Sequence, residues 1–147
     1  MRYQAPVYLA AGRSFGRTGP DSDGRNLTRT YVWHQGDGVV VAYITLMPYF
    51  IERETLGKKQ GRGLPDRIPG YLIARLALHR HLHGNGLGFH LLASALTRAV
   101  AGARDLGGRY VIVDAIDDHA ASFYRHHGFE PISTKEHRLV MPTKALE

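Results

Sequence analysis

The stretch YLIARLALHRHLHGNGLGFHLL, residues 71–92, joins two segments of different character through a turn rich in glycine. Residues 71–82 are an apolar run typical of a β-strand. From Gly86 to about Leu106 apolar side chains recur every three or four residues, which predicts a long helix. The glycines between the two segments are Gly84, Gly86 and Gly88. We therefore expect a strand, a tight turn and a helix in immediate succession.

The start of this helix has the properties of an anion-binding site. The first backbone N–H groups of a helix have no partners within the helix and lie at the positive end of its dipole. Residues without side chains in front of the helix allow the oxygens of an anion to approach these N–H groups closely. The sequence therefore predicts a phosphate or diphosphate site built from backbone around Gly86.

Other uses of a glycine turn fit less well. A nucleoside-triphosphate loop requires Gly-Lys-Ser/Thr before its helix, whereas Gly88 is followed by an aromatic residue and a histidine. A dinucleotide fold requires G-x-G-x-x-G, and the third glycine is missing in either register, although Asp114 resembles the ribose-binding acid of that fold. A hairpin turn at Asn85–Gly86 remains a structural alternative, but it does not explain the helical pattern that follows.

The other predicted elements place this unit in a central mixed sheet. We expect a short helix at 4–14, a loop at 15–26, a hairpin of strands at 27–35 and 39–52, a basic loop at 55–67, a buried strand at 109–116, a short helix from Asp117 or Asp118 to Gly128, and a last strand at 137–142. The order indicates an α/β or α+β fold. No repeat and no domain boundary is visible, so we expect one domain over residues 1–147.

Composition excludes several classes of protein. Apolar residues make up 44% of the chain and charged residues 22%, which is typical of a soluble domain. The chain has no cysteine, which excludes disulfides, thiolate catalysis and cysteine–zinc sites and favours a cytoplasmic location. The apolar runs are too short to cross a membrane, and the first residues do not form a secretory signal.

Positive charge is concentrated around the glycine turn. The chain has 19 Lys and Arg against 13 Asp and Glu, a net charge of +6. Between Lys58 and Arg104 there are eight basic residues and a single acid, Asp66. Such a window attracts an anionic ligand, an RNA or both, although a merely soluble basic surface would have the same composition.

The strand, glycine turn and helix together resemble the acetyl-CoA loop of the GCN5-related N-acetyltransferases (GNAT). The motif of that family is Gln/Arg-x-x-Gly-x-Gly/Ala; Gly86 and Gly88 match its glycines, and His83 stands where Gln or Arg is usual. A second block, AASFYRHHGFEP at 120–131, resembles the ending of one branch, the acetyltransferase toxins of type II toxin–antitoxin modules. The resemblance covers about residues 27–142. The first 26 residues lack the full opening of typical members, so we expect an incomplete start of the sheet or its completion by a partner.

The resemblance implies a sheet that is mostly antiparallel, splayed at the acetyl-CoA strand and flanked by helices. It also implies acetyl-CoA as the cofactor, aminoacyl-tRNA as the substrate, a ribbon-helix-helix antitoxin as a partner and a homodimer. The implied cofactor-binding residues are Leu76, Ala77, Leu78, His83, Gly84, Asn85, Gly86, Leu87, Gly88 and Phe123. A backbone N–H among residues 76–78, freed by a β-bulge, is expected to bind the thioester oxygen.

Tyr124 takes the catalytic role that the resemblance implies. A phenol with a pKa of about 10 can protonate a thiolate of similar basicity, so Tyr124 is the expected acid for the departing coenzyme. A packed aromatic beside Phe123 is the structural alternative. No pattern identifies the general base, for which water or His79 is a candidate.

The remaining basic residues suggest contacts with the substrate. Arg75, Arg80, Lys58 and Lys59 are candidate tRNA-binding residues. His79, His81 and His83 alternate, which would allow zinc binding from one strand face, but no acid or fourth ligand is nearby and we expect no metal. The leading hypothesis is acetylation of the amino acid on aminoacyl-tRNA, which blocks translation. The alternatives are a small-molecule or protein N-terminal acetyltransferase and an inactive acetyl-CoA- or RNA-binding module.

Overall fold

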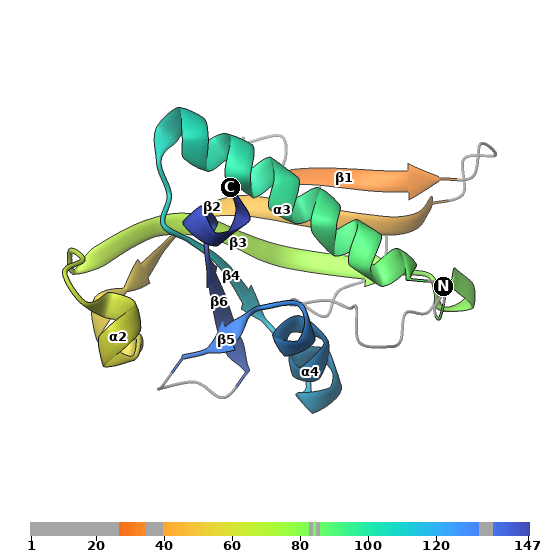
Figure 1. The fold of residues 1–147 in the computed structure, drawn as a ribbon. Coiled ribbons are helices and arrows are strands. Elements are labelled where there is room, and N and C mark those ends of the chain that lie inside the picture. Colours follow the sequence, from red (N-terminus) through yellow and green to blue (C-terminus); the bar gives the residue numbers. More distant parts are fainter. Residues whose placement is uncertain (1–26, 35–39, 83, 85, 133–136) are drawn as a thin grey trace.

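The computed structural model describes residues 27–34, 40–82, 84, 86–132 and 137–147 (Figure 1). The predicted helix at 4–14, the loop at 15–26, the expected incomplete opening and the hairpin turn at 36–38 lie outside these residues. Within the described part of the chain, no helix is long and apolar enough to cross a membrane.

One sheet of six strands organises these residues. The strands are β1 (Arg29–His34), β2 (Val40–Glu52), β3 (Arg67–Leu78), β4 (Tyr110–Asp114), β5 (Glu130–Pro131) and β6 (Arg138–Pro142). Their order across the sheet is β1-β2-β3-β4-β6-β5, and every neighbouring pair is antiparallel except β3 and β4. The mixed, mostly antiparallel sheet flanked by helices confirms the predicted fold class.

Two longer helices follow the predicted pattern. They are α3 (Leu87–Leu106), which ends at Gly107 with a φ of +87°, and α4 (Asp118–His126). The carboxylate of Asp117 caps α4 by accepting a hydrogen bond of 2.8 Å from the backbone N–H of Ala120. The shorter elements are α2 (Lys58–Gly61) and the 3₁₀ turns η1 (Arg53–Thr55), η2 (Arg80–Leu82) and η3 (Thr143–Leu146).

The sheet has two covered faces. Figure 1 shows α3 crossing the strands and α4 beside the end of β4. One face packs against these two helices; Val111 and Val113 point into this core. The alternate residues Tyr110 and Ile112 point to a second, smaller core on the other face, which includes Leu56 of the η1–α2 connection. The continuous apolar run of β4 therefore reflects burial on both faces, as predicted.

Three elements differ from the prediction by more than one or two residues at their ends. The strand expected at 71–82 begins at Arg67 and ends at Leu78, and residues 80–82 form a 3₁₀ turn instead. The loop expected at 55–67 contains the short helix α2. The two-residue strand β5 was not predicted, because two residues carry no periodic pattern.

Candidate functional site

The candidate site begins where β3 and β4 separate. The two parallel strands pair only from Gly70 with Tyr110 to Ile73 with Val113. The register between β2 and β3 shifts at Ala74, because Thr45 pairs with Arg75 whereas the next residue of β2 pairs with Ile73. One extra residue on β3 therefore makes a bulge, and beyond it β3 continues without β4 as a neighbour. The predicted splayed sheet is present, with its bulge two residues before Leu76.

The open edge of β3 presents backbone donors to this gap. In the part of the chain that the structure describes, β2 is the one strand that pairs with residues 76–78. The N–H of His79 donates to the carbonyl of Val41 on β2, over 2.7 Å. Because successive N–H groups of a strand point to opposite sides, the N–H groups of Leu76 and Leu78 point toward the gap, and that of Ala77 points toward β2. Two of the three predicted backbone donors therefore face the gap.

The N-terminus of α3 forms an open cradle. Gly86 precedes the helix with a φ of +76°, and no side chain caps it. Gly84 has a φ of +90°, and a Cβ at either glycine would meet no atom within 4 Å. The first turn has no acidic residue, and Gly88 lies within it. The helix begins directly after Gly86, which excludes the hairpin alternative. The predicted residues His83 and Asn85 lie outside the described part of the chain.

Tyr124 lies in the core between α4 and the sheet. Its side chain has 0% exposure, and its hydroxyl oxygen has no hydrogen-bond partner among the described residues. Burial raises its pKa above the ordinary value of 10.0, so the phenol remains protonated and available as a donor. An unpaired buried hydroxyl costs about 1–3 kcal/mol, which is unusual unless a ligand supplies the missing partner.

An aromatic group connects α4 with the start of α3. The ring of His127 lies 4.8 Å from Phe123 and 4.9 Å from Phe89. Phe123 also contacts the edge of the Tyr124 ring. Phe89, in the first turn of α3, is 46% exposed; the buried residues of α3 are Leu91, Leu92, Ala95, Ala99 and Val100. The predicted residue Leu87 is half-buried and packs against the main core.

An ion pair on the face of the sheet opposite α3 and α4 was not predicted from the sequence. Arg138 on β6 pairs with Asp114 on β4 and also donates to the hydroxyl of Tyr49 on β2, over 2.9 Å. The hydrogen bond to Asp114 is the main reason that the pKa of Arg138 is raised. Asp114 follows Val113, the last residue of β4 that pairs with β3, so this cluster borders the gap. Its three members are far apart in sequence, and only the position of Asp114 after a buried strand could have indicated a role.

The predicted basic residues do not form one group. Arg75 lies on β3 next to the bulge and is half-buried, and Arg80 is exposed on η2. Lys58 and Lys59 are exposed on α2, near the beginning of β3. The strand β3 ends at Leu78, so His79 lies beyond it, and His83 lies outside the described residues. Within the described residues, no group of three His, Asp or Glu side chains could hold a metal ion.

These features fit an extended thioester ligand with a diphosphate. The N–H groups at the start of α3 suit the diphosphate, and the gap beside β3 suits an extended chain that hydrogen-bonds like an added strand. The unpaired hydroxyl of Tyr124 suits a sulfur atom that becomes negatively charged. The arrangement therefore has what acyl transfer from a thioester requires.

Comparisons with known proteins agree with this geometry. A family model described as the acetyltransferase (GNAT) domain matches residues 26–131. A tRNA-acetylating toxin of Mycobacterium tuberculosis (strain ATCC 25618 / H37Rv) is 36% identical over 108 residues. The match covers 74% of this chain and 65% of that relative's length.

Two solved structures are similar in fold. AtaT complexed with acetyl-methionyl-tRNAfMet is 28% identical with a TM-score of 0.78, and the match covers 86% of this chain and 77% of that one. A tyrosine-to-phenylalanine mutant of the AtaT toxin, bound to the C-terminus of the antitoxin AtaR and acetyl-CoA, is 26% identical with a TM-score of 0.75. That match covers 99% of this chain and 86% of the other.

Proposed function

The chain belongs to the GNAT family of acetyltransferases, and from this premise we propose that it transfers the acetyl group of acetyl-CoA to the amino group of an aminoacyl-tRNA. The observation that carries the proposal is the gap between β3 and β4, with backbone N–H groups of β3 facing it and, in the adjoining core, the hydroxyl of Tyr124, which has no hydrogen-bond partner among the described residues. Acetylation removes the nucleophilic amine that peptide-bond formation requires, so the expected cellular effect is inhibition of translation.

The N-terminus of α3 holds the diphosphate of acetyl-CoA. Its donors are the backbone N–H groups of the first turn, including those of Leu87 and Gly88. Gly84 and Gly86 keep the approach free of side chains. His83 and Asn85 complete the loop in this proposal. Phe123 packs beside the cofactor as part of the aromatic group that joins α4 to α3.

The thioester lies in the gap, where acetyl-CoA supplies an activated acetyl group. The N–H group of Leu76 would stabilise the carbonyl oxygen as it gains negative charge, and Ala77 and Leu78 line the same segment. The amine would form a bond to the carbonyl carbon while the carbon–sulfur bond breaks, and the proton that the amine loses would pass to water or to His79. Tyr124 then gives its phenolic proton to the sulfur, and the raised pKa keeps this proton in place until the step occurs.

An aminoacyl-tRNA is the acceptor that the charge distribution favours. The window from Lys58 to Arg104 has eight basic residues and one acid, which suits a polyanion better than a small neutral amine. Of these eight basic residues, Arg75 and Arg80 are the closest in sequence to residues 76–78, the part of β3 that lines the gap. The relatives provide a second argument: AtaT was solved with acetyl-methionyl-tRNAfMet, and the curated relative is a tRNA-acetylating toxin.

Partners follow from the same proposal. The AtaT mutant was solved with the C-terminus of the antitoxin AtaR, so we expect this chain to bind an antitoxin, of the ribbon-helix-helix type, and to form a homodimer. A tRNA substrate also requires a cytoplasmic location. Co-expression with a small ribbon-helix-helix protein from the neighbouring reading frame, followed by light scattering of the free and bound chain, tests both the partner and the dimer.

Transfer of labelled acetyl groups tests the activity itself. Purified protein is incubated with acetyl-CoA and charged tRNA, and with uncharged tRNA as the blank. We expect label on the amino acid only with charged tRNA. Tyr124→Phe should lower kcat by about 10²–10⁴-fold with little change in KM. The control Tyr31→Phe, on β1, should retain full activity. Equal turnover of a small free amine, or an unchanged kcat in Tyr124→Phe, would contradict the proposal.

A further inference from the structure

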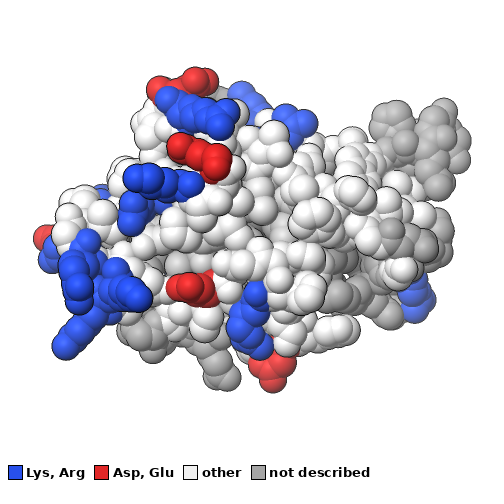
Figure 2. All heavy atoms as spheres, viewed as in Figure 1, with Lys and Arg blue, Asp and Glu red and all other residues white. Residues whose placement is uncertain are grey.

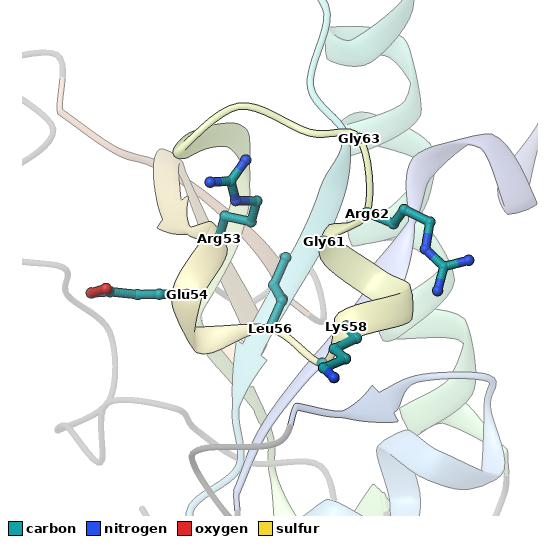
Figure 3. A pocket seen from close by; sticks show the side chains of 8 residues that line it. Arg53, Glu54, Leu56, Lys58, Gly61, Arg62 and Gly63 are labelled. Carbon is teal, nitrogen blue, oxygen red and sulfur yellow. The ribbon is translucent and has the colours of Figure 1, made fainter.

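A basic platform lies at the opposite end of β3 from the gap. It consists of η1, α2, the turn that leads into β3, and Arg109, which directly precedes β4. Figure 1 shows α2 at one end of the sheet, away from α4. Two hollows flank α2. One, of about 450 Å³, is lined by Arg53, Lys58 and Arg62 (Figure 3). The other, of about 660 Å³, is lined by Lys58, Lys59 and Arg109. Lys58 therefore stands between the two hollows.

The platform is held firmly to the sheet. The buried hydroxyl of Tyr110 on β4 donates to the carbonyl of Gln60, over 2.6 Å, and the Gln60 amide donates to the carbonyl of Pro131, over 3.3 Å. Leu56 is buried in the smaller core. Arg53 is held by Asp66 and by the carbonyl of Leu64, both at 2.6 Å. The exposed cations of α2 are thus carried on a short, anchored element.

Most of the cations on the platform lack an acidic partner. Within the described part of the chain, no ion pair involves Lys58, Lys59, Arg62 or Arg109. Each hollow has one acid on its lining, Glu54 in the first and Glu130 in the second. Figure 3 shows that Glu54 points away from Lys58 and Arg62. Figure 2 shows blue side chains gathered over the end of the molecule where α2 lies. A positive field remains here for a ligand.

The chemistry of the platform favours a phosphate backbone over an acidic protein. Protein interfaces depend on buried apolar and aromatic anchors. The large apolar side chains that line the two hollows, Leu56, Tyr110 and Ile132, are all buried. Contacts to nucleic-acid phosphates require only cations and N–H groups. Because two cationic hollows flank α2, a phosphate backbone that crosses α2 meets cations on both sides of it.

The length of β3 indicates which part of an RNA reaches the platform. Ala74 at the bulge lies seven positions after Arg67, beside the platform, which is roughly 23 Å at 3.3 Å per residue. A stacked strand advances about 3.4 Å per nucleotide, so this span equals about seven nucleotides. We propose that Lys58, Lys59, Arg62 and Arg109 bind phosphates in the base-paired acceptor stem of the tRNA, beyond its short unpaired 3′ end. This inference rests on the proposed function, which places the acylated end in the gap.

Two substrates that differ in length test the assignment. One is an aminoacyl-tRNA, and the other is the same amino acid esterified to a short single-stranded 3′ fragment. In Lys59→Ala/Arg62→Ala we expect kcat/KM for the tRNA to fall roughly tenfold through KM and its salt slope to decrease by about 1–2. The short fragment should react as it does with the wild type. The control Arg29→Ala/Lys144→Ala removes the same charge from exposed positions outside the basic window and should change neither substrate by more than about twofold.

Direct binding separates this proposal from the proposed function. Anisotropy of a labelled, uncharged tRNA needs no turnover, and its affinity should fall in the platform variant but not in the control. If the wild-type protein acetylates neither substrate while the platform variant still loses tRNA affinity, the proposed function fails and the platform stands. The platform assignment would be overturned if kcat/KM of the platform variant fell as much for the short fragment as for the tRNA. It would also be overturned if the variant kept its tRNA affinity, as expected of a platform that binds an acidic protein instead.

Discussion

Arg138 donates two nearly parallel hydrogen bonds to the carboxylate of Asp114, from Nε to Oδ1 over 2.6 Å and from Nη2 to Oδ2 over 2.7 Å. The pair joins β4 to β6 at the point where β4 leaves β3. The side chain of Arg138 is only 12% exposed and that of Asp114 is 39% exposed. A bidentate pair that is shielded on one side contributes more than a surface pair, because solvent screens it less and its geometry is fixed.

A double-mutant cycle on this pair should give a large coupling energy. We expect Asp114→Ala and Arg138→Ala to be coupled by about 1–3 kcal/mol in urea unfolding, because each single variant leaves a partly buried charge unpaired. The matched control is the pair of Arg67 and Glu52, whose atoms are 3.3 Å apart and whose side chains are 65% and 48% exposed. Its coupling should be about 0–1 kcal/mol. Similar coupling in the two cycles would refute the structural role of Asp114 and Arg138.

Tyr124 should respond to loss of its hydroxyl differently from an ordinary buried tyrosine. Since the hydroxyl has no partner among the described residues, Tyr124→Phe should leave the free energy of unfolding unchanged or raise it by up to about 1 kcal/mol. Tyr110 is the control, because it is also buried but its hydroxyl donates to Gln60. Tyr110→Phe should cost about 1 kcal/mol. The comparison is made by urea unfolding without ligand, and a clear destabilisation by Tyr124→Phe would mean that its hydroxyl has a partner in the free protein.

Much of the fold could be predicted because its signals are local. The helix α3 follows from apolar spacing and from Gly107, α4 from its Asp117 cap, and β4 from a continuous apolar run. The start of β3 was missed because Pro69 and Gly70 are typical of a turn. In the structure Gly70 lies inside the strand, and a Cβ there would collide with the carbonyl oxygen of Tyr110. Its role is close approach between strands, which depends on a residue forty positions away.

The candidate site also has a part that the sequence predicts and a part that depends on residues far apart in the chain. The glycines before α3 and the tyrosine of α4 are recognisable from spacing and from the resemblance to a family. The direction of the N–H groups of Leu76 and Leu78 depends on strand register, which no local pattern contains. The cluster of Tyr49, Asp114 and Arg138 joins three strands and exists only after folding. The platform was recognised as a basic loop, but its anchoring by Tyr110 and Pro131 was not predictable.

The proposed role of Gly86 in ligand binding can be separated from its role in the backbone. Gly86 and Gly63 both have a φ of +76°, and a Cβ at either position would meet no atom within 4 Å. Alanine at either position should therefore cost a similar 1–2 kcal/mol of stability through backbone strain alone. Of these two glycines, only Gly86 directly precedes the first backbone N–H groups of α3. Gly86→Ala should in addition weaken acetyl-CoA binding by about tenfold or more, equivalent to about 1.4 kcal/mol, whereas Gly63→Ala should not.

Calorimetric titration with acetyl-CoA, together with urea unfolding of both variants, makes this comparison. Dephospho-CoA, which keeps the diphosphate, should show the same difference between the two variants. Pantetheine lacks the diphosphate and binds more weakly. We expect its affinity to be the same for Gly86→Ala and Gly63→Ala. If Gly86→Ala and Gly63→Ala lose the same stability and bind acetyl-CoA equally well, the diphosphate does not contact the start of α3, and the placement of the cofactor on this helix would have to be abandoned.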